Sequence, residues 1–278
     1  MAAPQIDPRA VVSPDAVLGD DVTVGPFAVI EPGVVVGAGT RIGASAYLCT
    51  GTTLGRDNVV HMGVVLGNEP QDLAYRGAPT MLEIGDRNVF REGSQVHRGT
   101  AEGSRTVIGS DCFVMTNAHV AHNCEIADGV ILATGAVLGG HVQVGARAFV
   151  SGNCVVHQHG RIGRLAMLQG GARMSRDVPP FLIVNDLNRI RGVNVVGLRR
   201  AGLDAAALAA LRRLYRTLFL RRQNLKLARA RLVQDEAARG GLSAESAELL
   251  AFIDASRRGI CSAVPRGGAR VAEEESES

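Results

Sequence analysis

Residues 108–144 read IGSDCF VMTNAH VAHNCE IADGVI LATGAV LGGHVQ V, and an apolar residue opens every group of six. The same period begins near the start of the chain and continues to Met174, with phase breaks near residues 68–83 and 101–107. The apolar anchors are Ile6, Val12, Leu18, Val24, Ile30, Val36, Ile42, Leu48, Leu54, Val60, Leu66, Ile84, Phe90, Val96, Ile108, Val114, Val120, Ile126, Leu132, Leu138, Val144, Val150, Val156, Ile162, Leu168 and Met174. Every anchor is apolar although the chain is only 46% hydrophobic, so the period reflects the fold and not the composition.

A six-residue unit is too short for a helical hairpin and suits a short strand followed by a corner. If three units make one coil, equivalent residues of successive coils stack at about 4.8 Å, the spacing of neighbouring strands. The residue after the anchor is often Gly, as at Gly139 and Gly145, which suits a tight corner. The pattern therefore predicts an all-β parallel β-helix over residues 1–180, and it leaves the handedness of the coil open.

The repeat ends at Pro179 and Pro180, and a different organisation follows. We expect a linker over 181–202, an α-helical C-terminal domain over 203–258 and a disordered tail over 259–278. Asp204 is the expected N-cap of one long helix with apolar residues from Leu208 to Leu225, and a second helix should start after Ser243.

The sequence also indicates the cellular compartment of the protein and excludes some classes of ligand. The N-terminus has no charged segment followed by an apolar run, and no apolar stretch is long enough to span a membrane, so we expect neither a signal peptide nor a transmembrane segment. Five cysteines without a C-x-x-C pair argue against a disulfide framework and for a reducing cytoplasm. Cys112, Cys124 and Cys154 share the small fifth position of the repeat, which predicts buried packing. Nucleic-acid binding is not expected, because aromatic or groove-reading features are missing.

The histidines gather on one face if both phase breaks are loops pushed out of the coil. The units that begin at 66, 96, 120, 138 and 156 then stack on that face. They carry His97, His122, His141 and His157, while His119 lies at the corner leading into the face. None occupies an inward position, so these side chains should point outward in one vertical column. His61 and His159 are expected to be peripheral.

A histidine row of this kind has two chemical interpretations. One is a general base with supporting substrate contacts. The other is a zinc site of three histidines, as in related β-helix carbonic anhydrases, whose histidine pair is separated by five positions. The nearest pair here, His119 and His122, is separated by three, which favours the general base and no metal.

Eight short motifs, taken in order, resemble those of the UDP-N-acetylglucosamine O-acyltransferase family. They are Gly67–Thr80 (GNEPQDLAYRGAPT), Glu83–Asn88 (EIGDRN), His97–Thr100 (HRGT), Asn117–Cys124 (NAHVAHNC), Gly140–Val142 (GHV), His157–Gln158 (HQ), Asp177–Pro180 (DVPP) and Gly192–Gly197 (GVNVVG). The resemblance covers residues 6 to about 256. It implies a left-handed coil, a homotrimer with sites between subunits, and no cofactor. It also implies transfer of a (3R)-3-hydroxyacyl chain from acyl carrier protein to the 3-hydroxyl of UDP-N-acetylglucosamine, the first step of lipid A biosynthesis.

The resemblance also implies roles for individual residues. His122 would be the general base, and the Gly140 N–H would bind the oxyanion. Asp72, on the first extruded loop, resembles a substrate-binding aspartate. The residues that resemble the lining of the sugar, nucleotide and acyl pockets are His97, His119, His141, His157 and Gln158, and those that resemble nucleotide contacts are Asn194 and Arg200. Gly170 falls where the family measures acyl-chain length; either it leaves room for a longer chain or the turn requires it.

Several positions depart from the family pattern. Ala74 replaces a loop lysine near Arg76, Asn123 replaces an aspartate, and Ala201 replaces a basic residue. The segment from Asn188 to Arg191 is shorter than usual. These changes leave open an amino-sugar acceptor that would give an amide. A sister N-acyltransferase carries an N-terminal nucleotide-binding domain, whereas this chain enters the repeat at Ile6.

The segment 199–231 is strongly basic, with ten Lys and Arg residues and one acid, Asp204. Such a surface would attract the acidic acyl carrier protein by long-range electrostatics. The alternative is a solvated helical face.

Overall fold

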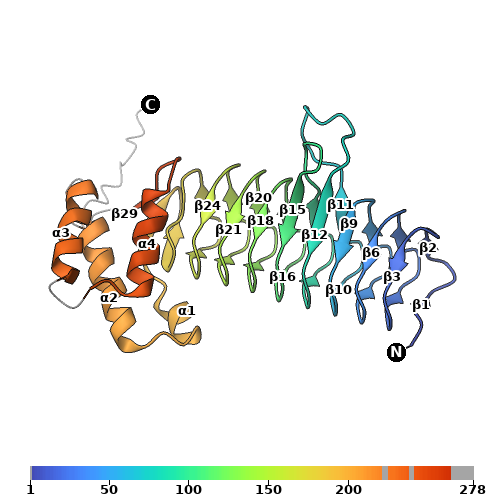
Figure 1. Ribbon diagram of the computed structural model, residues 1–278, viewed down its shortest axis with the longest axis horizontal. Coiled ribbons are helices and arrows are strands. Elements are labelled where there is room, and N and C mark those ends of the chain that lie inside the picture. The colour runs from blue at the N-terminus through green and yellow to red at the C-terminus, as the bar shows by residue number, and fades with distance from the viewer. Residues whose placement is uncertain (1, 221–224, 238–240, 264–278) are drawn as a thin grey trace, which may run out of the picture.

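A computed structural model describes residues 2–220, 225–237 and 241–263 of the chain. Short parallel strands stack into the three walls of a prism, and helices cover its C-terminal end (Figure 1). One wall holds β2 (Val11–Val12), β5 (Val29–Ile30), β8 (Tyr47–Leu48), β11 (Val65–Asn68), β14 (Gln95–His97), β17 (His119–Val120), β20 (Val137–Leu138), β23 (Val155–Val156) and β26 (Arg173–Met174). We call it the histidine wall.

The other two walls are built in the same way. One contains β1 (Gln5–Ile6), β4 (Thr23–Val24), β7 (Arg41–Ile42), β10 (Val59–Val60), β13 (Val89–Phe90), β16 (Phe113–Val114), β19 (Ile131–Leu132), β22 (Phe149–Val150), β25 (Met167–Leu168), β27 (Leu182–Asn185), β28 (Arg189–Val193) and β29 (Ser262–Ala263). The other contains β3 (Val17–Leu18), β6 (Val35–Val36), β9 (Thr52–Leu54), β12 (Met81–Ile84), β15 (Arg105–Ile108), β18 (Glu125–Ile126), β21 (Gln143–Val144) and β24 (Arg161–Ile162).

The strand register confirms three hexads per coil. Val65 pairs with Tyr47, which lies three hexads earlier in the sequence. Across the first loop Val65 pairs with Gln95, five hexads later, and across the second loop Gln95 pairs with His119, four hexads later. The first loop therefore lengthens its coil by two hexads and the second by one, and neither disturbs the stacking.

The loop boundaries differ from those expected. The first loop runs between the end of β11 and the start of β12, so it comprises residues 69–80, and it projects from the middle of the prism (Figure 1). The second comprises residues 98–104, earlier than the predicted 101–107, because Arg105–Ile108 pair in full with Met81–Ile84. The second half of the predicted loop is therefore the strand β15, which is held in place by its pairing with β12.

Anchors and fifth positions fill the prism interior. Ala118 and Cys124 are fully buried, as are the anchors that neighbour them. Ile6 is an exception at 45% exposure, because the first coil has no coil beneath it. All five cysteines are free and buried, and burial raises the pKa of the Cys124 thiol to about 12. Packing is therefore confirmed as their environment.

Buried asparagines replace the usual small residue at one corner of the prism. Asn88 donates from its backbone N–H and its side chain to the side-chain oxygen of Asn58, at 2.9 and 3.0 Å. The Asn88 oxygen in turn accepts from the Cys112 N–H at 2.8 Å. This ladder links three successive coils inside the prism, where unpaired amides would be costly.

The predicted linker over 181–202 is wrong, because these residues are mostly ordered secondary structure. β27 continues the wall parallel to β25, and β28 folds back on it antiparallel. Asp186 and Asn188 adopt positive φ in the turn between them, a conformation that Asp and Asn tolerate. The short helix α1 (Val195–Arg200) follows.

The C-terminal helices begin at the expected caps. Asp204 accepts from the Ala207 N–H at 2.8 Å at the start of α2 (Ala205–Tyr215), and Ser243 accepts from the Ser246 N–H at 3.2 Å at the start of α4 (Ala244–Asp254). The prediction of a single long helix is wrong. α2 passes into the π-helical segment η1 (Arg216–Leu220), and α3 (Leu225–Ala237) is a separate helix. No helix in the described ranges has the length and apolarity needed to cross a membrane.

The predicted tail at 259–278 is also partly wrong. Cys261 is buried, and β29 pairs in parallel with β28. Residues 259–263 therefore belong to the fold, and residues 264–278 lie outside the described residues.

Candidate active site

The histidine wall brings five imidazoles into a row. The rings of His97 and His119 are 5.1 Å apart between centroids, and those of His122 and His141 are 5.2 Å apart. His141 stacks on His159 at 4.5 Å with an interplanar angle of 14°. The predicted column is therefore present, but its C-terminal member is His159.

His157 was expected in the column and instead lies beside it. Its Nδ1 is 3.2 Å from the guanidinium of Arg258 in the C-terminal segment. His159 lies one coil after His141, and both have left-handed backbone with φ of 60°. Equal positions in successive coils give their side chains the same direction. Position within the hexad, which the sequence contains, would have identified His159.

Corner geometry also places the remaining residues of the row. Asn123, His141 and His159 occupy the same position on three successive coils, and all three have positive φ. His122 and Gly140 precede two of them, so Gly140 occupies on its own coil the place that His122 occupies on the coil before.

His122 is held by a hydrogen-bonded chain. Its Nδ1 is 3.0 Å from the side-chain oxygen of Asn123, and the same oxygen accepts from the hydroxyl of Thr100 at 2.9 Å. An amide oxygen accepts and cannot donate, so Nδ1 of His122 carries the proton and Nε2 carries the lone pair. The imidazole is thereby presented as a base on its outer side. Sequence reasoning did not assign a role to Thr100, although it closes the HRGT motif.

Gly140 provides the space in which the His122 ring lies. A Cβ at Gly140 would be 2.4 Å from Cε1 and 2.6 Å from Nε2 of His122, so a larger residue would overlap the ring. Within the described part of the chain, the Gly140 N–H donates to no other group. A base with a free lone pair and an unused amide donor thus adjoin each other.

Asp72 closes the site from the first loop. Its Oδ2 lies 4.0 Å from Nε2 of His122, and its Oδ1 accepts from the Ala74 N–H at 2.8 Å. Arg98 supports the loop by donating to the hydroxyl of Tyr75 at 3.1 Å. Arg76, the proposed substitute for the missing lysine, donates to loop carbonyls, including that of Tyr75 at 2.9 Å.

Burial keeps several imidazoles of the row neutral. All the histidines leave the prism core as expected, but His97 is only 2% exposed because the first loop covers it. Its Nδ1 donates to the carbonyl of Glu69 at 2.6 Å, and burial lowers its pKa. Burial also lowers the pKa of His119 and, with the nearby His159, that of His141. Neutral rings can accept hydrogen bonds from a polar ligand.

Two expected nucleotide contacts lie elsewhere. Asn194 is buried and caps α1, accepting from the Gly197 N–H at 3.1 Å and donating to the Leu165 carbonyl at 2.9 Å. Arg200 is exposed at the end of the same helix. Figure 1 shows α1 at the C-terminal end of the molecule and the first loop, which carries Asp72, near its middle, so within one chain these residues lie away from that loop.

A Cβ at Gly170 would meet only the carbonyl of Gly152, at 3.7 Å, and the positive φ of this turn belongs to Gly171. The turn therefore does not require glycine at 170. Among the described residues, no group of three or more His, Cys, Asp or Glu side chains is placed to hold a metal ion.

Comparison with known proteins identifies the fold and the family of the chain. Residues 177–261 match the family described as Udp N-acetylglucosamine O-acyltransferase, domain 2, and residues 105–140 match the bacterial transferase hexapeptide. The solved structure of the UDP-N-acetylglucosamine acyltransferase from Campylobacter jejuni superposes with a TM-score of 0.86 at 31% identity, covering 94% of this chain and all of that one. The left-handed parallel β-helix with C-terminal helices is thereby confirmed.

Sequence relatives extend over nearly the whole chain. The acyl-[acyl-carrier-protein]–UDP-N-acetylglucosamine O-acyltransferase of Stenotrophomonas maltophilia is 43% identical over 259 residues, which is 92% of this chain and 97% of that protein. The enzyme of the same name from Burkholderia orbicola is 41% identical over 92% of this chain and 98% of its own length. The chain is therefore an acyltransferase and belongs to the acyl-[acyl-carrier-protein]–UDP-N-acetylglucosamine O-acyltransferase family.

Proposed function

We propose that this protein transfers a (3R)-3-hydroxyacyl chain from acyl carrier protein to the 3-hydroxyl of UDP-N-acetylglucosamine, the first step of lipid A biosynthesis. The observation that carries this proposal is the fixed tautomer of His122 beside the unused N–H of Gly140. The relatives that cover the chain are named O-acyltransferases, so an amino-sugar acceptor gains no support.

His122 supplies the base. Its Nε2 takes the proton from the sugar hydroxyl as that oxygen attacks the thioester carbonyl, and the carbonyl oxygen becomes an oxyanion that accepts from the Gly140 N–H. Collapse of the intermediate breaks the carbon–sulfur bond, and the imidazolium returns its proton to the leaving sulfur. A positioned base contributes about 100- to 10,000-fold and one oxyanion donor about 100- to 1000-fold. Asp72, 4.0 Å from Nε2, stabilises the transient imidazolium.

The remaining polar residues bind substrate in this proposal. The neutral rings of His97, His119 and His141 accept from the sugar hydroxyls and amide. His157 and Gln158, one coil beyond Gly140, line the path of the acyl chain. Gly170 adds no side chain to that path, and a Cβ there would meet only the carbonyl of Gly152, at 3.7 Å. We therefore expect a longer acyl chain, with a 14-carbon donor used faster than a 10-carbon donor; clear preference for the shorter donor would contradict this assignment.

Asn194 and Arg200 contact the nucleotide only if a second subunit contributes them, and we propose a homotrimer with sites between subunits. Leu73, at the tip of the first loop, is 98% exposed, and Val155 on the histidine wall is 45% exposed. Apolar residues on an uncovered flat wall and loop tip suit an interface between copies. Analytical ultracentrifugation should give three times the 29.2 kDa mass of the chain; a monomer would refute the shared site.

Acyl carrier protein is the proposed donor partner, and the exposed arginines of α1 and α2 provide its electrostatic attraction. We propose a cytoplasmic location, since five unpaired, buried thiols suit a reducing compartment.

The direct test is acyl transfer from hydroxyacyl carrier protein to radiolabelled UDP-N-acetylglucosamine. His122→Ala should lose about 100- to 10,000-fold in rate. His61→Ala is the matched control, because His61 lies on another wall beside Glu92 and should leave the rate unchanged. Mild alkali should release the acyl group, since an ester is cleaved and an amide persists. Equal rates for His122→Ala and the parent would remove His122 as the base.

A further inference from the structure

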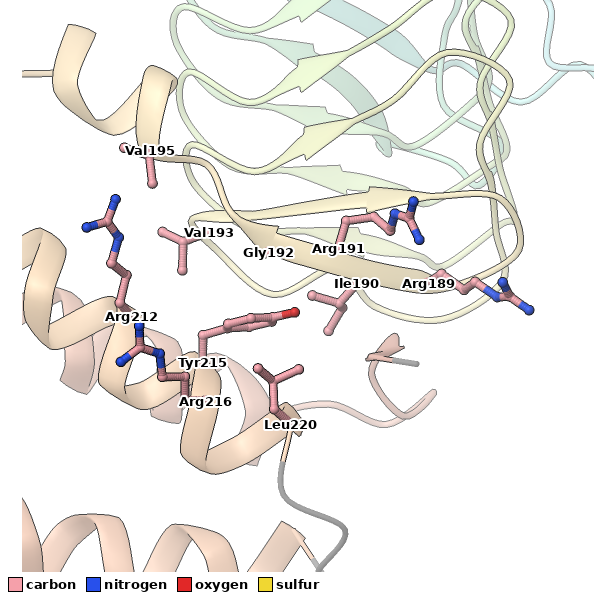
Figure 2. Close-up of a pocket in the computed structure, with 10 residues that line it drawn as sticks. All are labelled: Arg189, Ile190, Arg191, Gly192, Val193, Val195, Arg212, Tyr215, Arg216 and Leu220. Carbon is pink, nitrogen blue, oxygen red and sulfur yellow. The ribbon is translucent and has the colours of Figure 1, made fainter. Parts of the chain in front are cut away.

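A cleft lies between β28 and the α2–η1 helix, at the C-terminal end of the prism (Figure 2). Its volume is about 540 Å³, within the range of small-molecule sites. Arg189 and Arg191 of β28 and Arg212, Tyr215 and Arg216 of the helix line it, with the arginines around its rim (Figure 2). None of these residues belongs to the histidine row.

The cleft carries positive charge that the described part of the protein does not neutralise. No Asp or Glu among the described residues lines it, and Arg189 makes only an exposed contact with Asp186, at 4.0 Å. Within the same described ranges, Arg191, Arg212 and Arg216 have no acidic partner. The next arginine along the same helix differs, because Arg213 pairs with the buried Glu236 at 3.2 Å.

The arrangement within the cleft is amphipathic. Figure 2 shows the Tyr215 ring at the centre near Ile190 and Leu220, with Arg212 and Arg216 on one side and Arg189 and Arg191 on the other. Arg212 and Arg216 are one helical turn apart and so share one helix face. Arg216 also begins the π-helical segment η1, a rare geometry that often marks functional sites.

We propose that this cleft binds an organic phosphate ester. The guanidinium groups match phosphate oxygens with paired donors, and the ring of Tyr215 with its apolar neighbours receives the organic part. Two sources carry this chemistry: a free nucleotide, and the phosphodiester that links a carrier protein to its prosthetic arm. The second source rests on the proposed function, whereas the first is independent of it.

Calorimetric titration of the full chain with ADP and with pyrophosphate tests the site. ADP is chosen over UDP because a uridine nucleotide would also enter the acceptor site. We expect both probes to bind at low salt, and Arg191→Gln with Arg212→Gln to weaken binding at least tenfold. The matched control is Arg41→Gln with Arg147→Gln, which removes the same charge from exposed positions on the prism.

Competition separates the two sources. Displacement of ADP by carrier protein with its prosthetic arm, but not without it, would assign the site to the arm; no displacement by either would assign it to a free nucleotide. Displacement by both forms equally would indicate an acidic protein surface and overturn the proposal. So would absence of binding by either probe, or equal loss in the control. His122→Ala should retain ADP binding, so failure of the proposed acyl transfer would not affect this result.

Discussion

Replacing Gly140 by Ala tests the geometry of the site most directly. The new Cβ would lie 2.4 Å from Cε1 of His122, whereas ordinary contact begins at 3.4 Å, so the ring must retreat by about 1 Å. The backbone of Gly140 does not have the positive φ that resists a side chain. The substitution should therefore displace the base while the coil remains folded.

The expected cost follows from the displacement. A 1 Å error in the position of a reacting group can lower a rate by about 100-fold. Measured kcat for Gly140→Ala should fall by about that factor, with the melting temperature close to that of the parent.

Gly139→Ala is the matched comparison, at the neighbouring position. Its Cβ would lie 2.7 Å from the backbone nitrogen of Gln158, and backbone cannot retreat as a side chain can. This variant should lose stability. Full activity in Gly140→Ala, or a loss of its activity that only tracks unfolding, would refute the placement of His122 against Gly140.

Three further predictions concern the supports of the site and the core. Asn123→Asp places a carboxylate against the His122 ring and favours the imidazolium, so the acid limb of the kcat/KM profile should move to higher pH; an unchanged profile would contradict the contact. Asn88→Ala leaves the Cys112 N–H without its partner and removes one of the two hydrogen bonds to the Asn58 oxygen, which should cost about 1–3 kcal/mol in urea unfolding. An unchanged midpoint would show that the ladder is dispensable. Burial lowers the pKa of His97 below 6.5, so the unfolded chain binds more protons just below that pH, and stability should fall as the pH drops below about 6.5. His97→Gln should reduce the pH dependence of the melting temperature between about pH 7.5 and 5.5; the same slope in both proteins would exclude His97 as a source.

The prism could be predicted from sequence because its signal is local and repeated. Each inward apolar position can be recognised within its own hexad. A break in the six-residue period predicts a loop even when the pairing of the strands is unknown. Loop boundaries cannot be predicted from one hexad alone, because Arg105 belongs to β15 only through its pairing with Met81 of β12. The hairpin of β27 and β28 escaped prediction for a similar reason: Leu182–Asn185 takes its place by pairing with β25. The Asp and Asn of its turn were a usable signal.

The candidate site could likewise be predicted only in part. Which wall holds the histidines follows from counting hexads, and that part was correct. Which ring stacks on which depends on the corner conformation, because a left-handed residue directs its side chain differently from the residue before it. Asn123, His141 and His159 share the left-handed position, while His122 and Gly140 share the preceding one. A histidine above His122 at that preceding position would collide with it, so glycine there lets the ring lean outward over the next coil. The proposed catalytic arrangement therefore depends on the absence of a side chain at Gly140, which a search for histidines alone could not reveal.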